Sequence, residues 1–321
     1  MKFITRAYNS FIYNEDNKST IIKKSSEEKL LHEINYYKNL PENLKVYFPR
    51  IIEKNTSVKK PYSLELEYYA YTNLGNLMIN TQYNKKDWTD ILEFIFLYIN
   101  NYKLEKSIKS TKVDINKMLI EKTENEYFKL ANSDKFFDEF TKQEKIILNG
   151  QELYNFSYIW EDLKEKILCL DYEKDFYFFH GDLCFSNILY SKNPINNDAV
   201  LKFIDPRGTF GSKDYYGDLY YDLAKLSHSI NGGYEYIIYD QFEMNIENNK
   251  AELVYKNDNK DKIYNIFQEK IISTGYNPKI ITMMEGLIYI GMCARHYDSK
   301  ERQKVMYLTG VKLLNEFYEE I

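Results

Sequence analysis

The residues with the clearest chemical potential lie in the segment HGDLCFSN, residues 180–187. His180, Asp182 and Asn187 follow the pattern H-x-D-x4-N, and Asp205 ends the apolar run LKFID further along the chain. Phosphoryl transfer needs a divalent metal, positioned phosphates and one carboxylate near the attacking hydroxyl. Asp and Asn oxygens are ligands that suit Mg²⁺. A short loop can present Asp182 to an acceptor while Asn187 reaches a metal, and Asp205 can bridge metals from a neighbouring strand.

The same residues have a purely structural interpretation. His180-Gly181-Asp182 would then be a turn and Asp205-Pro206 a strand exit, each held by hydrogen bonds between side chains and the backbone. The spacing favours chemistry, because the added requirement for Gly181 makes a chance match of the motif much rarer.

Two segments resemble a known family. HGDLCFSNILY resembles the catalytic loop, and FIDPRG the metal-binding segment, of the aminoglycoside phosphotransferase and choline kinase family, which shares the two-lobed protein-kinase-like fold. The resemblance implies that Asp182 is the catalytic base, that Asn187 and Asp205 bind Mg²⁺, and that His180 organises the loop. It spans the chain in its order of elements, with the specific residues concentrated in 180–222. The phrase IDPRGTFG…YGDLYYDLAKL also resembles bacterial members encoded with capsule or surface-polysaccharide enzymes.

The small lobe of that family holds the α- and β-phosphates with a strand lysine, which a helix glutamate orients. TIIKK resembles this strand, so Lys24 and Glu33 are the candidates. Lys23 is the competitor, because alternate strand residues face opposite sides and the sequence does not fix the register. Residues 1–74 contain no glycine. We therefore expect a tight turn around Ser10 to cover the phosphates with its hydroxyl and backbone amides.

Five further residues could serve either chemistry or structure. Backbone groups near Glu67 and Tyr69, in the run YSLELEYYAY that would link the lobes, are expected to bind a purine, with core packing as the alternative. Asp218 and Asp222 lie on one helix face. We expect Asp218 to support the catalytic loop or the substrate cavity, and Asp222 to cap the helix or form a salt bridge. Arg207 could form bidentate hydrogen bonds with a phosphate or with an anionic acceptor, and a structural salt bridge is the alternative.

The elements that must position these residues form an α+β, two-lobed protein-kinase-like fold, with a small antiparallel-sheet N-lobe and a larger, mainly helical C-lobe. Alternation over 3–24 predicts three short strands, and helical spacing over 27–40 predicts one helix. Two more strands follow, in KVYFPRIIEK and YSLELEYYAY. We expect a nucleotide-binding lobe over 1–70 and a catalytic and substrate-binding lobe over 71–321.

The larger lobe is expected to be mainly helical around a strand–loop–strand region at 176–208. The polar segment 243–261 is predicted to be a surface loop. Helical patterns run over 86–104, 113–131, 134–148, 155–170, 217–231, 260–274, 278–297 and 299–320.

Bulk composition narrows the class of protein. With 321 residues, 44% of them hydrophobic and 28% charged, the chain can bury a full core in two lobes. A net charge of −5 argues against a nucleic-acid partner. Three scattered cysteines form no disulfide or zinc pattern, the start lacks a signal-peptide core, and the most apolar run, 91–99, is too short for a bilayer. We therefore expect a cytoplasmic protein without a membrane span.

The sequence thus predicts a Mg²⁺-dependent kinase that uses ATP or GTP and a small-molecule hydroxyl acceptor. A cationic amino alcohol would favour an aromatic and acidic pocket, whereas a sugar or polyol would favour paired carboxylates and amides, and composition permits both. The alternative is an inactive pseudokinase or regulatory binding module, which the missing glycines favour and the intact Asp182, Asn187 and Asp205 oppose. A protein kinase is disfavoured because no Ala-Pro-Glu-like segment follows Asp205, and a metallophosphoesterase because the other histidines stand in no ligand motif. The oligomeric state is not predicted.

Overall fold

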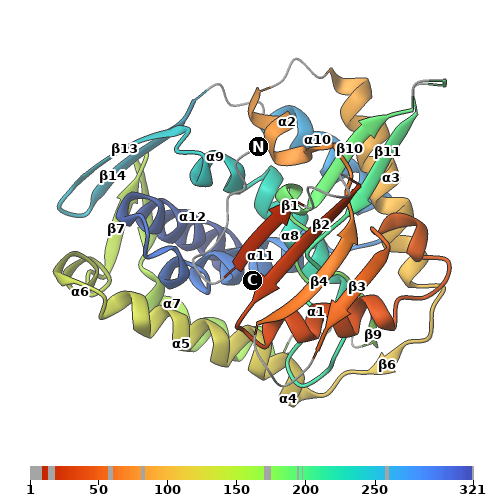
Figure 1. Cartoon of the computed structure of the whole chain (residues 1–321). Coiled ribbons are helices and arrows are strands. Elements are labelled where there is room, and N and C mark those ends of the chain that lie inside the picture. Colours follow the sequence, from red (N-terminus) through yellow and green to blue (C-terminus); the bar gives the residue numbers. More distant parts are fainter. Residues whose placement is uncertain are drawn as a thin grey trace.

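The structure, a computed structural model, describes residues 9–13, 19–56, 61–80, 84–169, 175–193, 195–196, 198–256 and 260–319. Within these ranges, a small antiparallel sheet with one helix adjoins a larger and mainly helical part (Figure 1). The two-lobed α+β fold expected from the sequence is therefore confirmed.

The small lobe is built on a four-stranded antiparallel sheet in the order β1-β2-β4-β3. Of the three strands expected over 3–24, the structure describes two, and residues 1–8 lie outside the described part. Alternation places Lys23 and Ser25 on one face of β2, and both are buried. Thr20, at the start of the strand, is buried on the opposite face. The strands are β1 (Asn9–Tyr13), β2 (Thr20–Ser25), β3 (Ile51–Asn55) and β4 (Tyr62–Glu67).

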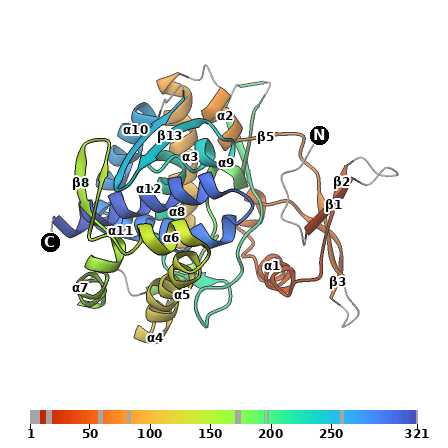
Figure 2. The same cartoon turned by 90° about the vertical axis from the view of Figure 1, so that its left-hand side faces the viewer.

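One helix, α1 (Lys29–Lys38), covers this sheet on the side of the larger lobe (Figure 2). Leu30, Ile34 and Tyr37 recur at helical spacing and are buried, which explains why the segment folds as an amphipathic helix. Glu33 lies on the same helix and is also buried. A short 3-10 turn, η1 (Lys45–Tyr47), leads from α1 to β3.

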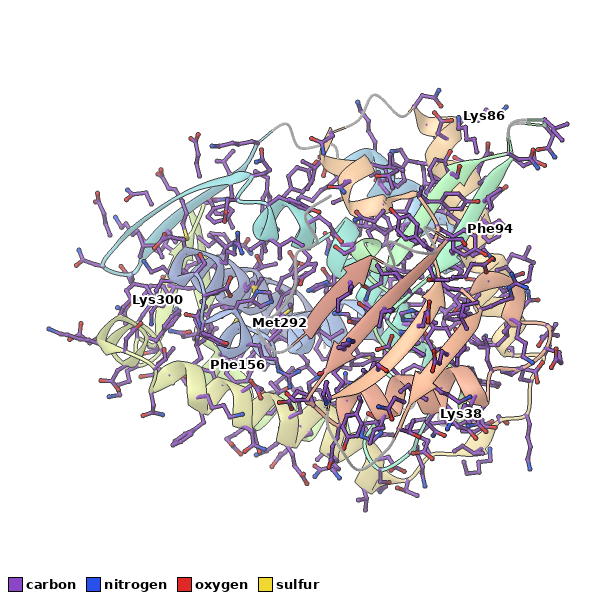
Figure 3. All side chains as sticks on the ribbon, in the orientation of Figure 1. Lys38, Lys86, Phe94, Phe156, Met292 and Lys300 are labelled. Carbon is purple, nitrogen blue, oxygen red and sulfur yellow. The ribbon has the colours of Figure 1, made fainter. Side chains whose placement is uncertain are left out.

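The larger lobe is organised around α8, whose residues are all buried. Helices α11 and α12 pack together, and α11 also packs against α8. Phe156, labelled in Figure 3, is fully buried in this lobe, whereas the labelled Lys86 is exposed. The helices are α2 (Leu74–Asn80), α3 (Lys85–Tyr102), α4 (Lys112–Ile115), the π-helix η2 (Asn116–Glu121), α5 (Lys122–Ala131), α6 (Lys135–Phe140), α7 (Phe156–Cys169), the 3-10 helix η3 (Phe185–Asn187), α8 (Leu219–Ile230), α9 (Tyr234–Ile238), α10 (Lys260–Ser273), α11 (Pro278–Ile290), the 3-10 helix η4 (Cys293–His296) and α12 (Lys300–Glu319).

Three small sheets connect these helices, in the orders β11-β10-β5, β12-β9-β6 and β13-β14-β7-β8. The first two flank the segment that contains the H-x-D-x4-N motif. Residues 68–71 lead from β4 of the small lobe to β5, which pairs with β10. The strands are β5 (Thr72–Asn73), β6 (Ile108–Lys109), β7 (Lys145–Leu148), β8 (Gln151–Tyr154), β9 (Asp175–Phe178), β10 (Ile188–Lys192), β11 (Ala199–Phe203), β12 (Tyr216–Gly217), β13 (Phe242–Glu247) and β14 (Lys250–Tyr255).

The helix expected over 134–148 was wrong in its second half. Helix α6 ends at Phe140, and β7 and β8 form a hairpin instead. The turn contains Asn149 and Gly150, both with positive φ, 50° and 83°. Asn-Gly is the preferred pair for such a two-residue turn, because both positions need left-handed backbone.

The surface loop expected over 243–261 was also wrong, because β13 and β14 form an antiparallel hairpin there. The hairpin joins β7 through a parallel pairing. Phe242, Met244 and Ile246 alternate with polar residues and are partly buried against the core. This period of two is the strand signal, although the polar composition of the segment concealed it.

None of the helices within the described residues combines the length and the apolar character needed to cross a bilayer.

Candidate active site

The H-x-D-x4-N segment forms a loop between β9 and β10. Leu183 and Phe185 are fully buried, and the Phe185 ring stacks on Trp88 with a centroid distance of 5.6 Å. Gly181 has φ 77°, and a Cβ there would lie 2.8 Å from the Cβ of Arg207. The glycine therefore allows both the turn and the close approach of the segment after β11. The apolar anchors leave Asp182 and Asn187 partly exposed.

Backbone hydrogen bonds tie the end of β11 to this loop. The N–H of Ile204 donates to the carbonyl of Asn187 at 3.0 Å, and the N–H of Arg207 donates to the carbonyl of His180 at 2.8 Å. Asp205, between them, has φ 57°, a left-handed conformation that is uncommon for a residue other than glycine. Such strain is retained where the surroundings impose it, often at functional sites. These contacts bring Asp205 to the loop of Asp182 and Asn187, as the motif predicts.

His180 is fully buried inside the loop, with its ring stacked on Phe48 at 6.1 Å. Its Nδ1 accepts from the N–H of Asp182 at 3.2 Å, and its Nε2 lies 3.0 Å from the carbonyl oxygen of Ile204. Burial lowers the pKa of His180 to about 4, so the ring is neutral at pH 7. The geometry is that of a residue that organises the loop.

The expected roles of Asp218 and Asp222 are exchanged. The Asp222 carboxylate accepts from the N–H groups of His180 at 2.8 Å and Gly181 at 2.7 Å, so it is the residue that supports the loop. Asp218 is the N-cap of α8 and accepts from the N–H of Tyr220 at 2.9 Å. The reason is the helix start: α8 begins directly after Asp218, which leaves Asp222 one turn inside and facing the loop.

Lys225, which the sequence analysis missed, contacts the proposed base. Its Nζ lies 2.9 Å from Oδ1 of Asp182, and its side chain is only 9% exposed. Burial alone would raise the pKa of Asp182, but the charges of Lys225 and Lys29 outweigh burial and hold it well below the usual range. Lys225 follows Asp222 by three residues and so shares its helix face, which is the signal that could have found it.

The small lobe contributes a buried ion-pair network. Lys23 Nζ contacts Glu33 Oε2 at 2.6 Å and also pairs with Oδ1 of Asp205. The lysine that pairs with Glu33 is therefore Lys23, and the expectation for Lys24 was wrong. Register is the reason: Lys24 lies opposite Ser10 in β1 and Ser63 in β4, one residue out of phase with the buried face.

Two side-chain oxygen atoms of the site, Oδ1 of Asn187 and Oδ2 of Asp205, accept no hydrogen bond from the described residues. Nδ2 of Asn187 donates to the carbonyl of Asp182 at 2.9 Å, and within the described residues no group donates to its Oδ1. The same holds for Oδ2 of Asp205, whose Oδ1 pairs with Lys23. The described residues contain no group of three His, Cys, Asp or Glu side chains that could hold a metal alone. An amide and a carboxylate oxygen fit Mg²⁺, which commonly takes few protein ligands and completes its shell with phosphates and water.

The phosphate-covering turn expected around Ser10 is described only in part, because residues 1–8 lie outside the described residues. The backbone of Ser10 lies within strand β1, and its side chain is outside the described part. A strand position cannot supply the cluster of amides that a tight turn would provide. The residues from 14 to 18, between β1 and β2, are also outside the described part.

The segment between the lobes starts at Glu67. Its carboxylate accepts from the hydroxyl of Tyr69 at 2.7 Å and pairs with Arg50 at 3.2 Å. The N–H groups of Glu67 and Tyr68 donate to the carbonyls of Arg50 and Ser19, whereas that of Tyr69 has no acceptor within the described residues. Within this segment, the backbone N–H of Tyr69 is therefore the group that could donate a hydrogen bond to a purine.

Among the described residues, Arg207 forms no salt bridge, which was the structural alternative to binding a phosphate or an anionic acceptor. Its Nη1 donates to the hydroxyl of Tyr221 at 3.0 Å.

Solved structures with a similar arrangement are aminoglycoside phosphotransferases. A thermostable mutant of aminoglycoside phosphotransferase APH(4)-Ia, in a ternary complex with AMP-PNP and hygromycin B, has a TM-score of 0.61 and 9% identity, covering 98% of this chain and 92% of that chain. APH(2'')-Ib bound to ADP has a TM-score of 0.53 and 10% identity, covering 97% and 93%. APH(3'')-Id from Streptomyces rimosus has a TM-score of 0.50 and 12% identity, covering 97% and 91%. At these identities the likeness establishes the kinase-like fold. No protein-family model matches the sequence, and no curated protein matches it.

Proposed function

We propose that the chain is a kinase that transfers the γ-phosphoryl group of ATP or GTP to a hydroxyl of a sugar, a polyol or an amino alcohol. The observation that carries this proposal is the convergence of Asp182, Asn187 and Asp205 at one loop, with Lys23 joined to Asp205 from the other lobe. The structural neighbours, which bind AMP-PNP or ADP, support a nucleotide as donor.

Each residue has a task in this reaction. Asp182 is ionised at neutral pH and would accept the proton of the acceptor hydroxyl as that oxygen bonds to the γ-phosphorus. The bond from the γ-phosphorus to the bridging oxygen breaks at the same time, so the products are a phosphate ester and a nucleoside diphosphate. Lys225 would keep the Asp182 carboxylate oriented, and Lys23 would hold donor phosphates, with Glu33 fixing the lysine.

Mg²⁺ would be held by Oδ1 of Asn187 and by Asp205, and it would neutralise charge on the donor phosphates. The backbone of Tyr69 would pair with the purine. The protein's own contribution is to orient these groups before the substrates arrive, which is where most of the rate enhancement of phosphoryl transfer originates.

For the alternative of an inactive pseudokinase or binding module, the absence of glycine from residues 1–74 remains the one supporting observation, and the structure adds none. The proposed base and both proposed metal ligands are present, so we favour the kinase. The suggestion that the product enters a capsule or surface polysaccharide rests on the phrase IDPRGTFG alone, and the structural neighbours add no support to it.

The test is ADP release from ATP with Mg²⁺ over a panel of sugars, polyols, amino alcohols and aminoglycosides. We expect one class of acceptor to stimulate release, and Asp182→Asn to lower kcat by about 10²–10⁴-fold, as removal of a general base does. The matched control is Asp198→Asn, an exposed aspartate on the loop between β10 and β11. Acceptor-dependent release that survives in Asp182→Asn would contradict the proposed mechanism.

A further inference from the structure

Two cations beside the catalytic loop converge on one tyrosine. The Nζ of Lys122, the first residue of α5, lies 3.1 Å from the hydroxyl of Tyr221, and Nη1 of Arg207 lies 3.0 Å from the same oxygen. Both cationic groups also lie over the Tyr221 ring, at 5.5 and 5.8 Å from its centroid. Tyr221 itself is only 3% exposed. The three residues form what we call the cationic cluster.

The cationic cluster has no carboxylate partner in the part of the chain that the structure describes. This contrasts with Lys23 and Lys225, each of which meets a carboxylate. Lys122 and Arg207 are partly exposed, so water offsets some of the cost of bringing two positive charges to one buried hydroxyl without a counter-ion. The rest of that cost needs a reason, and partial exposure leaves both cations accessible to a ligand.

The positive charges around Tyr221 change the pKa of its hydroxyl. Burial alone would raise the pKa of its phenol, but Lys122, Arg207 and Lys225 outweigh burial and lower it to about 7. Burial also lowers the pKa of Lys122, to about 8, so this lysine remains largely protonated at pH 7. The cluster thus retains excess positive charge near neutral pH, even though the net charge of the chain is −5.

The cationic cluster lies next to the reacting groups. Arg207 follows Asp205 by two residues, and its N–H bonds to the carbonyl of His180. Tyr221 precedes Lys225 by four residues on α8, so the two side chains lie on one helix face about 5–6 Å apart. Because Lys225 contacts Asp182, the cationic cluster is about one helical turn from the base.

We propose that Lys122, Arg207 and Tyr221 bind an anionic group, a carboxylate or a phosphate, of the acceptor whose hydroxyl faces Asp182. This proposal rests on the proposed kinase function. A guanidinium, an ammonium and a hydroxyl together give several donors of the kind that recognises a carboxylate or a phosphate. The acceptor would be a small hydroxy acid, a sugar acid or a sugar phosphate, in contrast to the amine-bearing acceptors of aminoglycoside phosphotransferases.

The first experiment compares acceptors in which the substituent at one carbon is neutral, anionic or cationic. The two series are glycerol, glyceric acid and 3-amino-1,2-propanediol, and glucose, glucuronic acid and 6-amino-6-deoxyglucose, with glucose 6-phosphate to separate phosphate from carboxylate. We expect kcat/KM for an anionic member to exceed that of its neutral analogue at least about tenfold, since even one hydrogen bond between charged groups contributes about that factor. A preference for the neutral or the cationic member would overturn the proposal.

Variants of the cationic cluster test whether these residues cause the preference for an anionic acceptor. The double variant Lys122→Gln with Arg207→Gln should lose the preference for the anion while KM for ATP stays unchanged. The control is Lys129→Gln, on the exposed side of the same helix, where the lysine pairs with Glu126. A change in KM for ATP without a change in anion preference would assign the cationic cluster to the nucleotide and overturn the proposal.

The second experiment does not require turnover. Phenolate absorbance at 295 nm, taken as native protein minus Tyr221→Phe, follows the ionisation of Tyr221 against pH, with and without inorganic phosphate or glycerate. A bound anion offsets the two cations, so the midpoint should move to higher pH in the native protein and not in the double variant. An unchanged midpoint would mean that the Tyr221 phenolate is itself the counter-ion, and the proposal would fall.

The two proposals fail separately. Isothermal titration calorimetry of ADP binding in the presence of Mg²⁺ tests the nucleotide site alone. An anion-dependent midpoint without nucleotide binding would refute the kinase and keep an anion site. Nucleotide binding and Asp182-dependent turnover without any anion effect would keep the kinase and refute the anionic acceptor.

Discussion

The lysine of the small lobe and the cationic cluster of the large lobe differ in how their charge is balanced. Lys23 is enclosed by Glu33 and Asp205, so the chain supplies both counter-charges. Lys122 and Arg207 converge on a hydroxyl that is neutral below its pKa of about 7. The first region has its counter-charges in the folded chain, whereas we propose that the second receives its counter-charge from a ligand. A charge that the fold leaves unbalanced is therefore a better guide to the acceptor than the overall composition.

The largest expected effect comes from breaking the balanced region. Lys23→Met leaves the buried Glu33 carboxylate without its partner, and loss of one member of such a pair costs about 3–5 kcal/mol when both are buried. Because Asp205 is 40% exposed on its side chain, we expect about 3 kcal/mol, measured by urea unfolding, together with loss of ADP binding. Lys24→Met, one residue along the strand, should change neither quantity appreciably. An equal loss in both variants would refute the distinction between the two lysines.

An intermediate effect is expected at Lys225, whose ammonium group contacts Asp182, the proposed base. Lys225→Met should lower kcat about 10–100-fold at pH 7, because the Asp182 carboxylate loses the contact that orients it. Without the lysine the pKa of Asp182 rises, so the acidic limb of the pH–rate profile should move to higher pH.

The control for Lys225 is the exposed Lys142, which pairs with Asp138 at 2.6 Å. Lys142→Met removes the same type of ion pair from the surface and should leave the profile unchanged. If Lys225→Met lowers kcat without moving the acidic limb, the lysine does not act through the ionisation of Asp182.

The smallest effect has the opposite sign and lies in the unbalanced region. Burial lowers the pKa of Lys122 from its ordinary 10.5 to about 8, so the unfolded chain binds this proton more tightly than the folded chain does. The resulting cost to stability is complete below pH 8 and disappears as the pH rises through 10.5. At pH 6, where the Tyr221 phenol is neutral, Lys122→Met should therefore stabilise the protein by about 1 kcal/mol, allowing for partial exposure.

Thermal unfolding of Lys122→Met and native protein at pH 6 and pH 10.5 measures this difference. The gain should be larger at pH 6. Destabilisation at pH 6 would show that the cationic cluster is balanced from within, like the network around Lys23.

What the sequence could predict depended on whether a residue's partners lie close to it in the chain. Asp182 and Asn187 belong to one short loop, and Asp205 ends the next buried strand, so residue type and spacing were enough to predict their convergence. Asp218 and Asp222 lie one helical turn apart, so which of them caps the helix depends on where α8 begins. The sequence did not fix that start, and the roles of the two residues were therefore exchanged.

Lys23 could not be assigned from spacing, and Lys225 could be found from its spacing only once Asp222 is known to face the loop of Asp182. The choice between Lys23 and Lys24 depends on the pairing of β2 with β1 and β4, which is a property of the assembled sheet. Lys225 meets Asp182 only because α8 lies beneath the catalytic loop. The Asn149-Gly150 turn could have been predicted, because both residues favour left-handed backbone, but the helix expected over 134–148 overlooked it.

The π-helix η2 makes the geometry of the cationic cluster depend on chain length as well as on residue type. Asp114, just before η2, is held by the hydroxyl of Ser212, and Lys122 is the first residue after it. A π-turn holds one residue more than the α-turn it replaces, and each residue of an α-helix corresponds to a rotation of about 100°. η2 can therefore lose one residue by becoming an α-turn while Lys122 still faces Tyr221. A second deletion would rotate Lys122 by about 100° away from Tyr221 although every side chain of the cluster stayed in the sequence, so the choice of acceptor would tolerate the first deletion and not the second.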